Sequence, residues 1–222
     1  MYFVKVFEVF LTLKKRQMKK INLFLTFVAL IAVSQFGFAQ ITGSAHDFSS
    51  ATWNTSNQEI CIVCHTPHNA TTLPDAPLWN HALSTASYTL YASGTLNATM
   101  GQPDGSSKLC LSCHDGTVAI ENYGGVTTGG TFMTGGPLIG TDLSNDHPVS
   151  FLYDAALAAA DPGLRNPSTA LSGLGGTINA NMLISGKMQC SSCHDVHNGA
   201  GIAGLLLKSN TGSALCLTCH DK

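Results

Sequence analysis

CSSCHDVHN, at residues 190–198, contains the pattern that decides how this chain folds. Its cysteine pair is followed directly by a histidine, and this C-x-x-C-H pentapeptide occurs four times. The copies begin at Cys61, Cys110, Cys190 and Cys216 and use all eight cysteines of the 222-residue chain. In c-type haem attachment, two thiols add across porphyrin vinyl groups and the adjacent imidazole ligates the iron. The sequence therefore predicts four haem c groups per chain.

Each motif supplies two attachment residues and one proximal iron ligand. The predicted thioether residues are Cys61, Cys64, Cys110, Cys113, Cys190, Cys193, Cys216 and Cys219. The predicted proximal ligands are His65, His114, His194 and His220. Zinc knuckles and redox C-x-x-C sites share the cysteine spacing, but neither needs a histidine after the second cysteine four times over. A disulfide framework would not impose this spacing either.

The first 39 residues have the form of a leader with a signal peptide. Met18-Lys19-Lys20 precedes an apolar stretch from Ile21 to Val33, and small residues follow at Gly37 and Ala39. We expect cleavage after Ala39, which leaves residues 40–222 as a single tetrahaem domain beginning at about Gln40. An uncleaved membrane anchor is the alternative. No other segment is long and apolar enough to insert stably in a bilayer.

Export fits the chemistry, because haem c is attached outside the cytoplasm. We expect a secreted protein at the cell surface or in the medium, or alternatively in the periplasm. Six of the eleven Lys and Arg residues lie in the leader, so residues 40–222 carry five basic against twelve acidic side chains. Nucleic-acid binding is disfavoured, because phosphate recognition needs a basic footprint.

The predicted fold class is mostly irregular and coil-rich, with short helices and few short strands arranged around four haems. Residues 40–222 provide too few side chains for an ordinary apolar core beside four porphyrins. Gly, Ser, Thr, Asn and Ala dominate between the motifs and disfavour long elements. We expect short helices at the C-x-x-C-H turns and over residues 151–160, and loops over residues 124–140 and 161–180.

The second axial ligand of each iron separates electron carriers from enzymes. Five histidines lie outside the motifs and are candidates for four distal positions: His46, His68, His81, His147 and His197. This surplus predicts bis-histidine, low-spin haems with one histidine to spare. Methionine is the alternative ligand, and we interpret Met100, Met133, Met182 and Met188 as packing or loop residues.

Two distal candidates follow a proximal ligand by only three residues. His68 follows His65, and His197 follows His194. A porphyrin separates its two axial faces, so neither histidine can reach around the ring of its own motif. Each is expected to ligate a different haem and so to hold neighbouring haems close together.

The order of motifs resembles that of the secreted tetrahaem cytochromes that polymerise into extracellular filaments, the cytochrome nanowires. The segments that carry the resemblance span residues 46–222: HDFSS, CIVCHTPHN, PLWNH, CLSCHDGT, DHPVSF, CSSCHDVHN and CLTCHDK. The resemblance implies a continuous row of bis-histidine haems in which one haem takes its distal ligand from the adjoining subunit. The inter-subunit ligand implied here is His68.

The expected function is relay of electrons along this row, without enzymatic activity. The expected partners are further copies of the chain in a filament, a redox donor and an extracellular acceptor. A soluble, monomeric periplasmic shuttle is the first alternative. A multihaem reductase would need an open iron position, and a membrane quinol oxidase partner would need the leader as an anchor.

Overall fold

The computed structural model divides the chain into two units, Met1–Ala39 and Gln40–Lys222. It describes residues 40–54, 58–73 and 76–221, so the predicted leader lies outside the described residues. None of the helices in these described ranges is long and apolar enough to cross a membrane.

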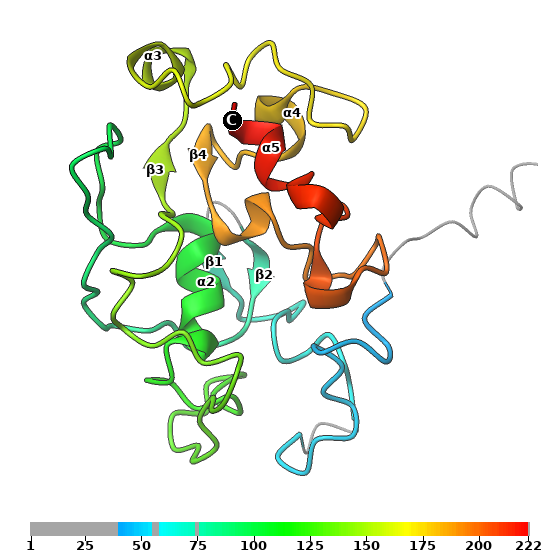
Figure 1. Cartoon of the computed structure of the whole chain (residues 1–222). Helices are drawn as coiled ribbons and strands as arrows, with labels where there is room; N and C mark the ends of the chain where they lie inside the picture. Colours follow the sequence, from blue (N-terminus) through cyan, green and yellow to red (C-terminus); the bar gives the residue numbers. More distant parts are fainter. Residues whose placement is uncertain (1–39, 55–57, 74–75, 222) are drawn as a thin grey trace, which may run out of the picture. The chain divides into compact units, whose positions relative to one another are not determined.

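Irregular backbone dominates the second unit, which confirms the coil-rich fold class (Figure 1). The helices and strands are β1 (Thr71–Leu73), β2 (Ala76–Trp79), α2 (Gly105–His114), β3 (Phe151–Leu152), α3 (Ala155–Ala160), α4 (Ile178–Asn181), β4 (Lys187–Met188) and α5 (Cys216–Cys219). Single 3₁₀ turns lie at η1 (Cys190–Ser192), η2 (Ala203–Leu205) and η3 (Thr211–Ser213).

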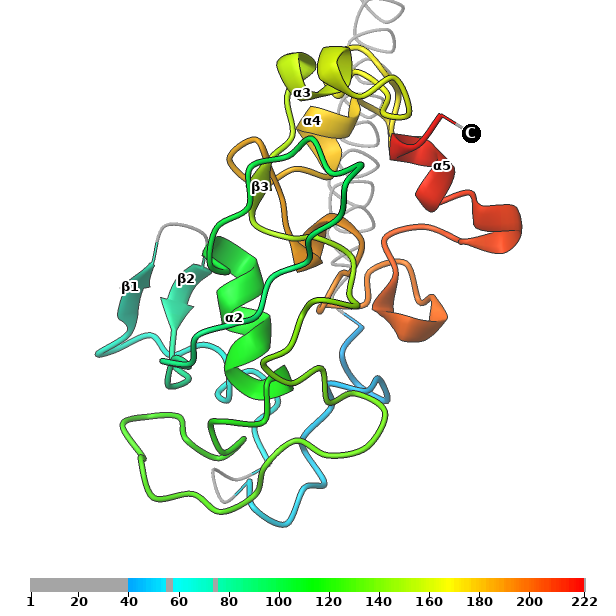
Figure 2. The ribbon, with the colours of Figure 1, turned by 60° about the vertical axis from the view of Figure 1, so that its left-hand side comes forward.

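The strands of the described residues form two separate antiparallel pairs. In the first pair β1 runs against β2, and in the second β3 runs against β4, where Phe151 lies opposite Met188. The β1–β2 pair lies beside α2 (Figure 2). Two short ladders leave most backbone groups to be satisfied by turns and by crossings between distant loops.

Helix α2 is the longest described helix and docks the second motif against the third. Its Ser107 side chain is fully buried, and the Ser107 hydroxyl accepts a hydrogen bond from the Cys190 backbone N–H at 3.0 Å. The Ser107 backbone N–H in turn donates to Gln189 Oε1 at 3.1 Å. Small hydroxyl residues in this helix therefore allow two C-x-x-C-H segments to approach closely.

The helix predicted over residues 151–160 begins later than expected. Phe151 and Tyr153 are buried while Leu152 is exposed, which is the alternation of a strand rather than of a helix. Helix α3 starts only after Asp154, whose carboxylate caps it by accepting a hydrogen bond from the Leu157 backbone N–H at 2.9 Å. Pairing with β4 overrides local helix propensity in the first half of the segment.

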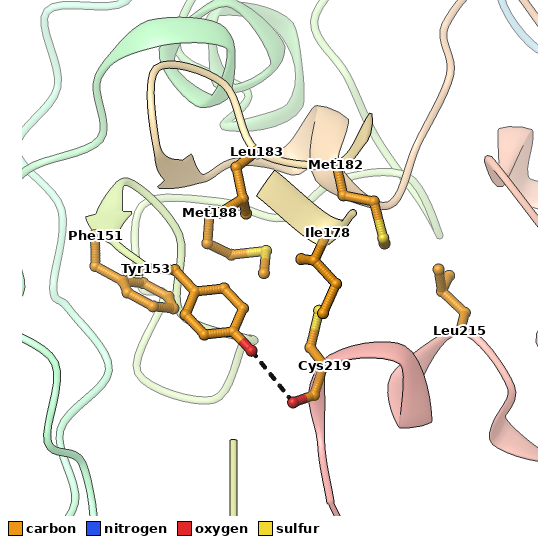
Figure 3. Close-up of a cluster of buried hydrophobic side chains, with 8 residues drawn as sticks. All are labelled: Phe151, Tyr153, Ile178, Met182, Leu183, Met188, Leu215 and Cys219. Carbon is orange, nitrogen blue, oxygen red and sulfur yellow. Dashed lines mark hydrogen bonds between the residues drawn. The ribbon is translucent and has the colours of Figure 1, made fainter. Parts of the chain in front are cut away.

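The C-terminal part contains an apolar cluster that the sequence argument did not anticipate (Figure 3). Its eight buried members are Phe151, Tyr153, Ile178, Met182, Leu183, Met188, Leu215 and Cys219. The Tyr153 hydroxyl donates to the Cys219 carbonyl at 3.3 Å, which ties the cluster to the last motif. Two smaller clusters surround Trp79 and Tyr88. Apolar packing is therefore local, in patches beside the motifs.

Truncation inside this cluster should destabilise the protein. Ile178 is fully buried, so Ile178→Ala is expected to lower the free energy of unfolding by about 2–5 kcal/mol. Leu171, which is 76% exposed, provides the control. Leu171→Ala should change the free energy of unfolding by less than about 0.5 kcal/mol. Denaturant unfolding of the holoprotein measures both. Equal effects of the two substitutions would contradict the assignment of this cluster as a packed core.

Candidate haem sites

Each C-x-x-C-H motif folds into one tight turn that places its two thiols beside its imidazole. The histidine backbone N–H donates to the carbonyl of the first cysteine in three of the motifs, and the second motif ends α2. These bonds are His65 to Cys61 at 2.8 Å, His194 to Cys190 at 3.1 Å and His220 to Cys216 at 3.0 Å. The turn fixes the three groups that a covalently bound haem requires.

A second segment crosses each motif and orients its histidine. The Nδ1 atoms of three proximal histidines contact backbone carbonyls: His65 with Pro77 at 2.8 Å, His114 with Pro137 at 2.7 Å and His194 with Gly204 at 2.8 Å. Because a carbonyl only accepts, Nδ1 carries the proton and Nε2 keeps a free lone pair. This is how proteins orient a metal-ligating imidazole.

The crossing is the same backbone arrangement at the first, third and fourth motifs. The backbone N–H of the residue after the proximal histidine donates to a carbonyl of the crossing segment. Two residues after that carbonyl, a backbone N–H of the crossing segment donates to the carbonyl of the motif's second cysteine. With the donor named first, the bonds are Thr66–Leu78 and Asn80–Cys64 at the first motif, Asp195–Leu205 and Leu207–Cys193 at the third, and Asp221–Gly163 and Arg165–Cys219 at the fourth. Their lengths are 2.6–2.9 Å.

Sequence reasoning missed these crossing segments, although they share a weak signal. They read PLWN at 77–80, PLIG at 137–140, PGLR at 162–165 and GLLL at 204–207, so each begins with Pro or Gly and includes Leu. Three of them follow their motif and one precedes its motif, which is why a fixed offset could not reveal them.

Three proximal imidazoles face a second imidazole from a distant segment. The ring centroids are 6.2 Å apart for His65 and His197, 6.1 Å for His114 and His46, and 6.2 Å for His220 and His147. Two metal–nitrogen bonds of about 2 Å, plus about 1.2 Å from each nitrogen to its ring centroid, add to roughly 6.4 Å. The spacing fits one iron between the rings of each pair.

The environment of His46 also suits a neutral ligand. Burial lowers the pKa of His46, and the neighbouring His114 lowers it further. Metal binding requires an unprotonated imidazole nitrogen, so this shift favours the form that coordinates.

The fourth proximal histidine, His194, differs from the other three. Over the described ranges, no second imidazole faces His194, which is exposed. The His68 side chain is also exposed, and none of the described rings packs against it. Within the described residues, His194 therefore has no facing imidazole, and the exposed His68 faces no proximal histidine.

His81 is placed differently from the other candidates. It is only 2% exposed, its Nδ1 lies 2.8 Å from the Ala82 carbonyl, and its Nε2 lies 3.2 Å from the carbonyls of Ala119 and Ile120. Both ring nitrogens lie near backbone carbonyls, Nε2 also lies 3.6 Å from the Cys113 sulfur, and no described proximal histidine packs against the His81 ring. This geometry matches a structural histidine.

The four motifs follow one another in a series. Cysteines of consecutive motifs lie close enough for one to raise the pKa of the other: Cys64 acts on Cys113, Cys190 on Cys110, and Cys216 on Cys193. Burial raises the pKa of Cys64 to about 11 and that of Cys113 to about 12. All eight cysteines are free thiols in this structure. Groups attached to them would lie in one continuous row.

The donor set differs from that of a zinc or thiolate redox site. Residues 40–54, 58–73 and 76–221 contain no group of three or more His, Cys, Asp or Glu side chains that could hold a metal ion by themselves. At Cys64 and Cys113, burial raises the pKa of the thiol and so disfavours the thiolate that both of those sites use. The imidazole pairs fit a metal that brings its own equatorial ligands, as haem iron does.

An orphaned donor supports the same interpretation. The Trp79 Nε1 atom is buried without an acceptor, and its indole packs in a cluster with Leu109 and against Cys64. Buried polar groups of this kind almost always have a partner. A haem propionate beside the first two motifs would provide one.

Residues 184–222, which include the third and fourth motifs, match the protein-family model described as the doubled CXXCH motif. The match indicates a multihaem c-type cytochrome. The C-x-x-C-H motifs indicate covalent binding of haem c. No curated protein matches the chain significantly.

The angles between paired imidazole planes give a spectroscopic prediction. The His65 and His197 rings are 16° apart, whereas those of His147 and His220 are 74° apart. Near-parallel axial rings separate the iron d orbitals, while crossed rings leave two of them nearly degenerate. Electron paramagnetic resonance of the oxidised protein should therefore contain both a rhombic and a highly anisotropic low-spin signal.

A variant assigns the two signals. His147→Ala should remove the highly anisotropic signal and leave the rhombic one unchanged. Loss of the rhombic signal instead, or an unchanged spectrum, would contradict the pairing of His147 with His220.

Proposed function

We propose that this chain carries electrons along four bis-histidine haem c groups and polymerises into an extracellular conductive filament. Haem c, when bound, supplies an iron that changes between ferric and ferrous states. The chain's own part is to hold the haems covalently, keep both axial ligands in place and set the distance between neighbouring sites.

The observation that carries the electron-transfer proposal is the three imidazole pairs at 6.1–6.2 Å. Two protein ligands on an iron leave no position for a substrate, so these sites suit outer-sphere electron transfer. The pairing of His197 with His65 adds a link between sites, because His197 is three residues from His194. One short peptide then serves two neighbouring haems.

The filament proposal rests on the unmatched pair His68 and His194. Among the described residues, His68 is an exposed donor, and no second imidazole faces the exposed His194. If His68 of each subunit binds the iron at His194 of the next, the contact is heterologous, and such a contact repeats into an open filament unless it closes into a ring. The row of haems would then continue from subunit to subunit.

The proposed location and partners follow from the composition. Export by the leader would place the filament outside the cytoplasm, where a redox donor loads it and an extracellular acceptor unloads it. Residues 40–222 carry an excess of acidic side chains, so docking partners should be basic, neutral or bridged by cations.

One observation favours a second candidate function. An iron bound by His194 alone would have the open position that a multihaem reductase needs. In that case the isolated, reduced protein should bind carbon monoxide at one site, and it should remain a discrete particle at all concentrations. The periplasmic shuttle would also stay monomeric.

Substitution of the exposed donor tests the filament. His68→Ala should retain four covalent haems but abolish filaments, because it removes only the proposed ligand to the neighbouring subunit. One iron in four should become five-coordinate and bind carbon monoxide after reduction. Negative-stain microscopy, intact-mass measurement and optical spectroscopy give the three results.

His81→Gln is the matched control, since it also removes a non-motif imidazole. It should leave all four irons six-coordinate and should leave filaments intact. Long filaments from His68→Ala would refute the inter-subunit ligand, and a five-coordinate iron in His81→Gln would mean that His81 is a distal ligand after all.

A further inference from the structure

The residue after the second proximal histidine is a buried carboxylate in a dense hydrogen-bond network. Asp115 is only 4% exposed. It accepts hydrogen bonds from the Tyr88 hydroxyl at 2.6 Å, the Thr117 backbone N–H at 2.7 Å, the Thr117 hydroxyl at 2.8 Å and the Ser84 hydroxyl. All four contacts come from groups that can donate a proton.

The directions of these bonds indicate an ionised carboxylate. A backbone N–H such as that of Thr117 can only donate. The Ser84 hydroxyl oxygen accepts from the Ala86 backbone N–H at 3.1 Å, so its own proton is available to Asp115. An ionised carboxylate is an acceptor only, which matches this set of donors.

No basic side chain neutralises this charge. The described residues contain ion pairs between Asp104 and Lys187 and between Asp221 and Arg165, but Asp115 forms none. A buried charge without an opposite charge is strongly unfavourable. A ferric haem with two neutral imidazoles carries one net positive charge at its centre, which disappears on reduction. With haem bound at His114, Asp115 would therefore have its counter-charge only in the oxidised state.

The equivalent positions at the other motifs lack this combination. The first motif has Thr66, which carries no charge. Asp195 has a side chain that is 25% exposed and lies near the His197 ring, at 3.8 Å from Nδ1. The Asp221 side chain is 65% exposed and pairs with Arg165 at 3.0 Å. Solvent and a cation therefore screen the charge of Asp221, whereas that of Asp115 is screened only by its hydrogen-bond donors.

Helix α2 adds a field of the same sign. It has ten residues and ends at His114, so the negative end of its dipole lies at the second proximal imidazole. The third and fourth motifs contain only a three-residue 3₁₀ turn and a four-residue helix. The second site thus combines two features that favour ferric iron.

We propose that Asp115, together with the C-terminal end of α2, makes the haem attached at Cys110 and Cys113 the lowest-potential site of the chain. This inference rests on the proposed electron-transfer function and deepens it. Asp115 acts through the negative charge of its carboxylate and does not contact the iron. Within the row, the second site is the last to accept an electron and the first to release one.

The size of the effect follows from Coulomb's law. The carboxylate belongs to the residue next to the ligand, so it lies on the order of 10 Å from the iron. At an effective dielectric constant of about 20, one charge at that distance changes the ferrous-to-ferric ratio by roughly tenfold. A tenfold change corresponds to about 59 mV for a one-electron couple.

Asp115→Asn tests the proposal, because the amide keeps the shape and removes the charge. It should raise the lowest midpoint potential by roughly 59 mV and leave the other three unchanged. Asp221→Asn is the matched control, because Asp221 occupies the same motif position but is exposed and paired with Arg165. This substitution should shift none of the midpoint potentials. Spectroelectrochemical titration of monomeric holoprotein measures both.

Three outcomes would overturn the proposal: an unshifted lowest midpoint, a shift confined to a higher midpoint, or an equal shift in Asp221→Asn. A second measurement does not depend on folding of the variant. In partially oxidised wild-type protein, paramagnetic NMR should show that the haem methyl groups nearest α2 reach the oxidised state first. Oxidation of another haem first would also refute the proposal.

The experiment separates this inference from the proposed function. Titration uses single subunits, so a failure to form filaments leaves the result interpretable. Intact mass measured before the titration shows whether the chain carries four haems, and a smaller number would count against the proposed function before the potentials are compared.

Discussion

The spacing of paired imidazoles is the constraint on which the rest of this structure depends. Three pairs of rings lie 6.1–6.2 Å apart, and their members are separated by long stretches of sequence. In the described residues, two short antiparallel strand pairs, isolated bridges and the crossing segments are what bring distant backbone segments together. Closing such long loops has an entropic cost that grows slowly with loop length, and iron bonds between paired imidazoles would repay it in the holoprotein. Haem ligation by these pairs would then take the role that a large apolar core has in other proteins of this size.

The sequence predicted the chemistry of each motif but not its surroundings. Covalent haem attachment and the coil-rich fold follow from local composition and from a pattern five residues long. The distal partner of each site does not, because it depends on which loop crosses which motif. Nothing in the sequence distinguishes His147 from His81 as a candidate distal ligand. In the structure His147 faces His220, whereas His81 is buried against the Ala119 and Ile120 carbonyls. Similarly, residues 151–152 form a strand because β4 is available to pair with them.

The internal crossing segments explain how unequal motif spacing can give equivalent sites. At the first, third and fourth motifs the same two backbone bonds join the motif to a segment that begins with Pro or Gly. Each supplies a carbonyl or a backbone N–H without using a specific side chain, so the sequence signal is weak. Equivalent geometry at the iron is then compatible with loops of very different length between the motifs.

Each motif supplies the same proximal ligand and thioether residues, so differences between haems arise from the angle between the paired rings and from the surroundings of each site. Asp115, Asp195 and Asp221 follow a proximal histidine in the same Cys-His-Asp order, so the sequence alone assigns them one role. Burial separates them, because Tyr88 and Ser84 enclose Asp115 while Asp221 faces solvent beside Arg165. A charge excluded from water acts over a longer distance than one that is hydrated. The loop that carries Ser84 and Tyr88, remote in sequence from the second motif, thus determines the electrostatics of that motif, and four chemically identical sites need not be energetically equal.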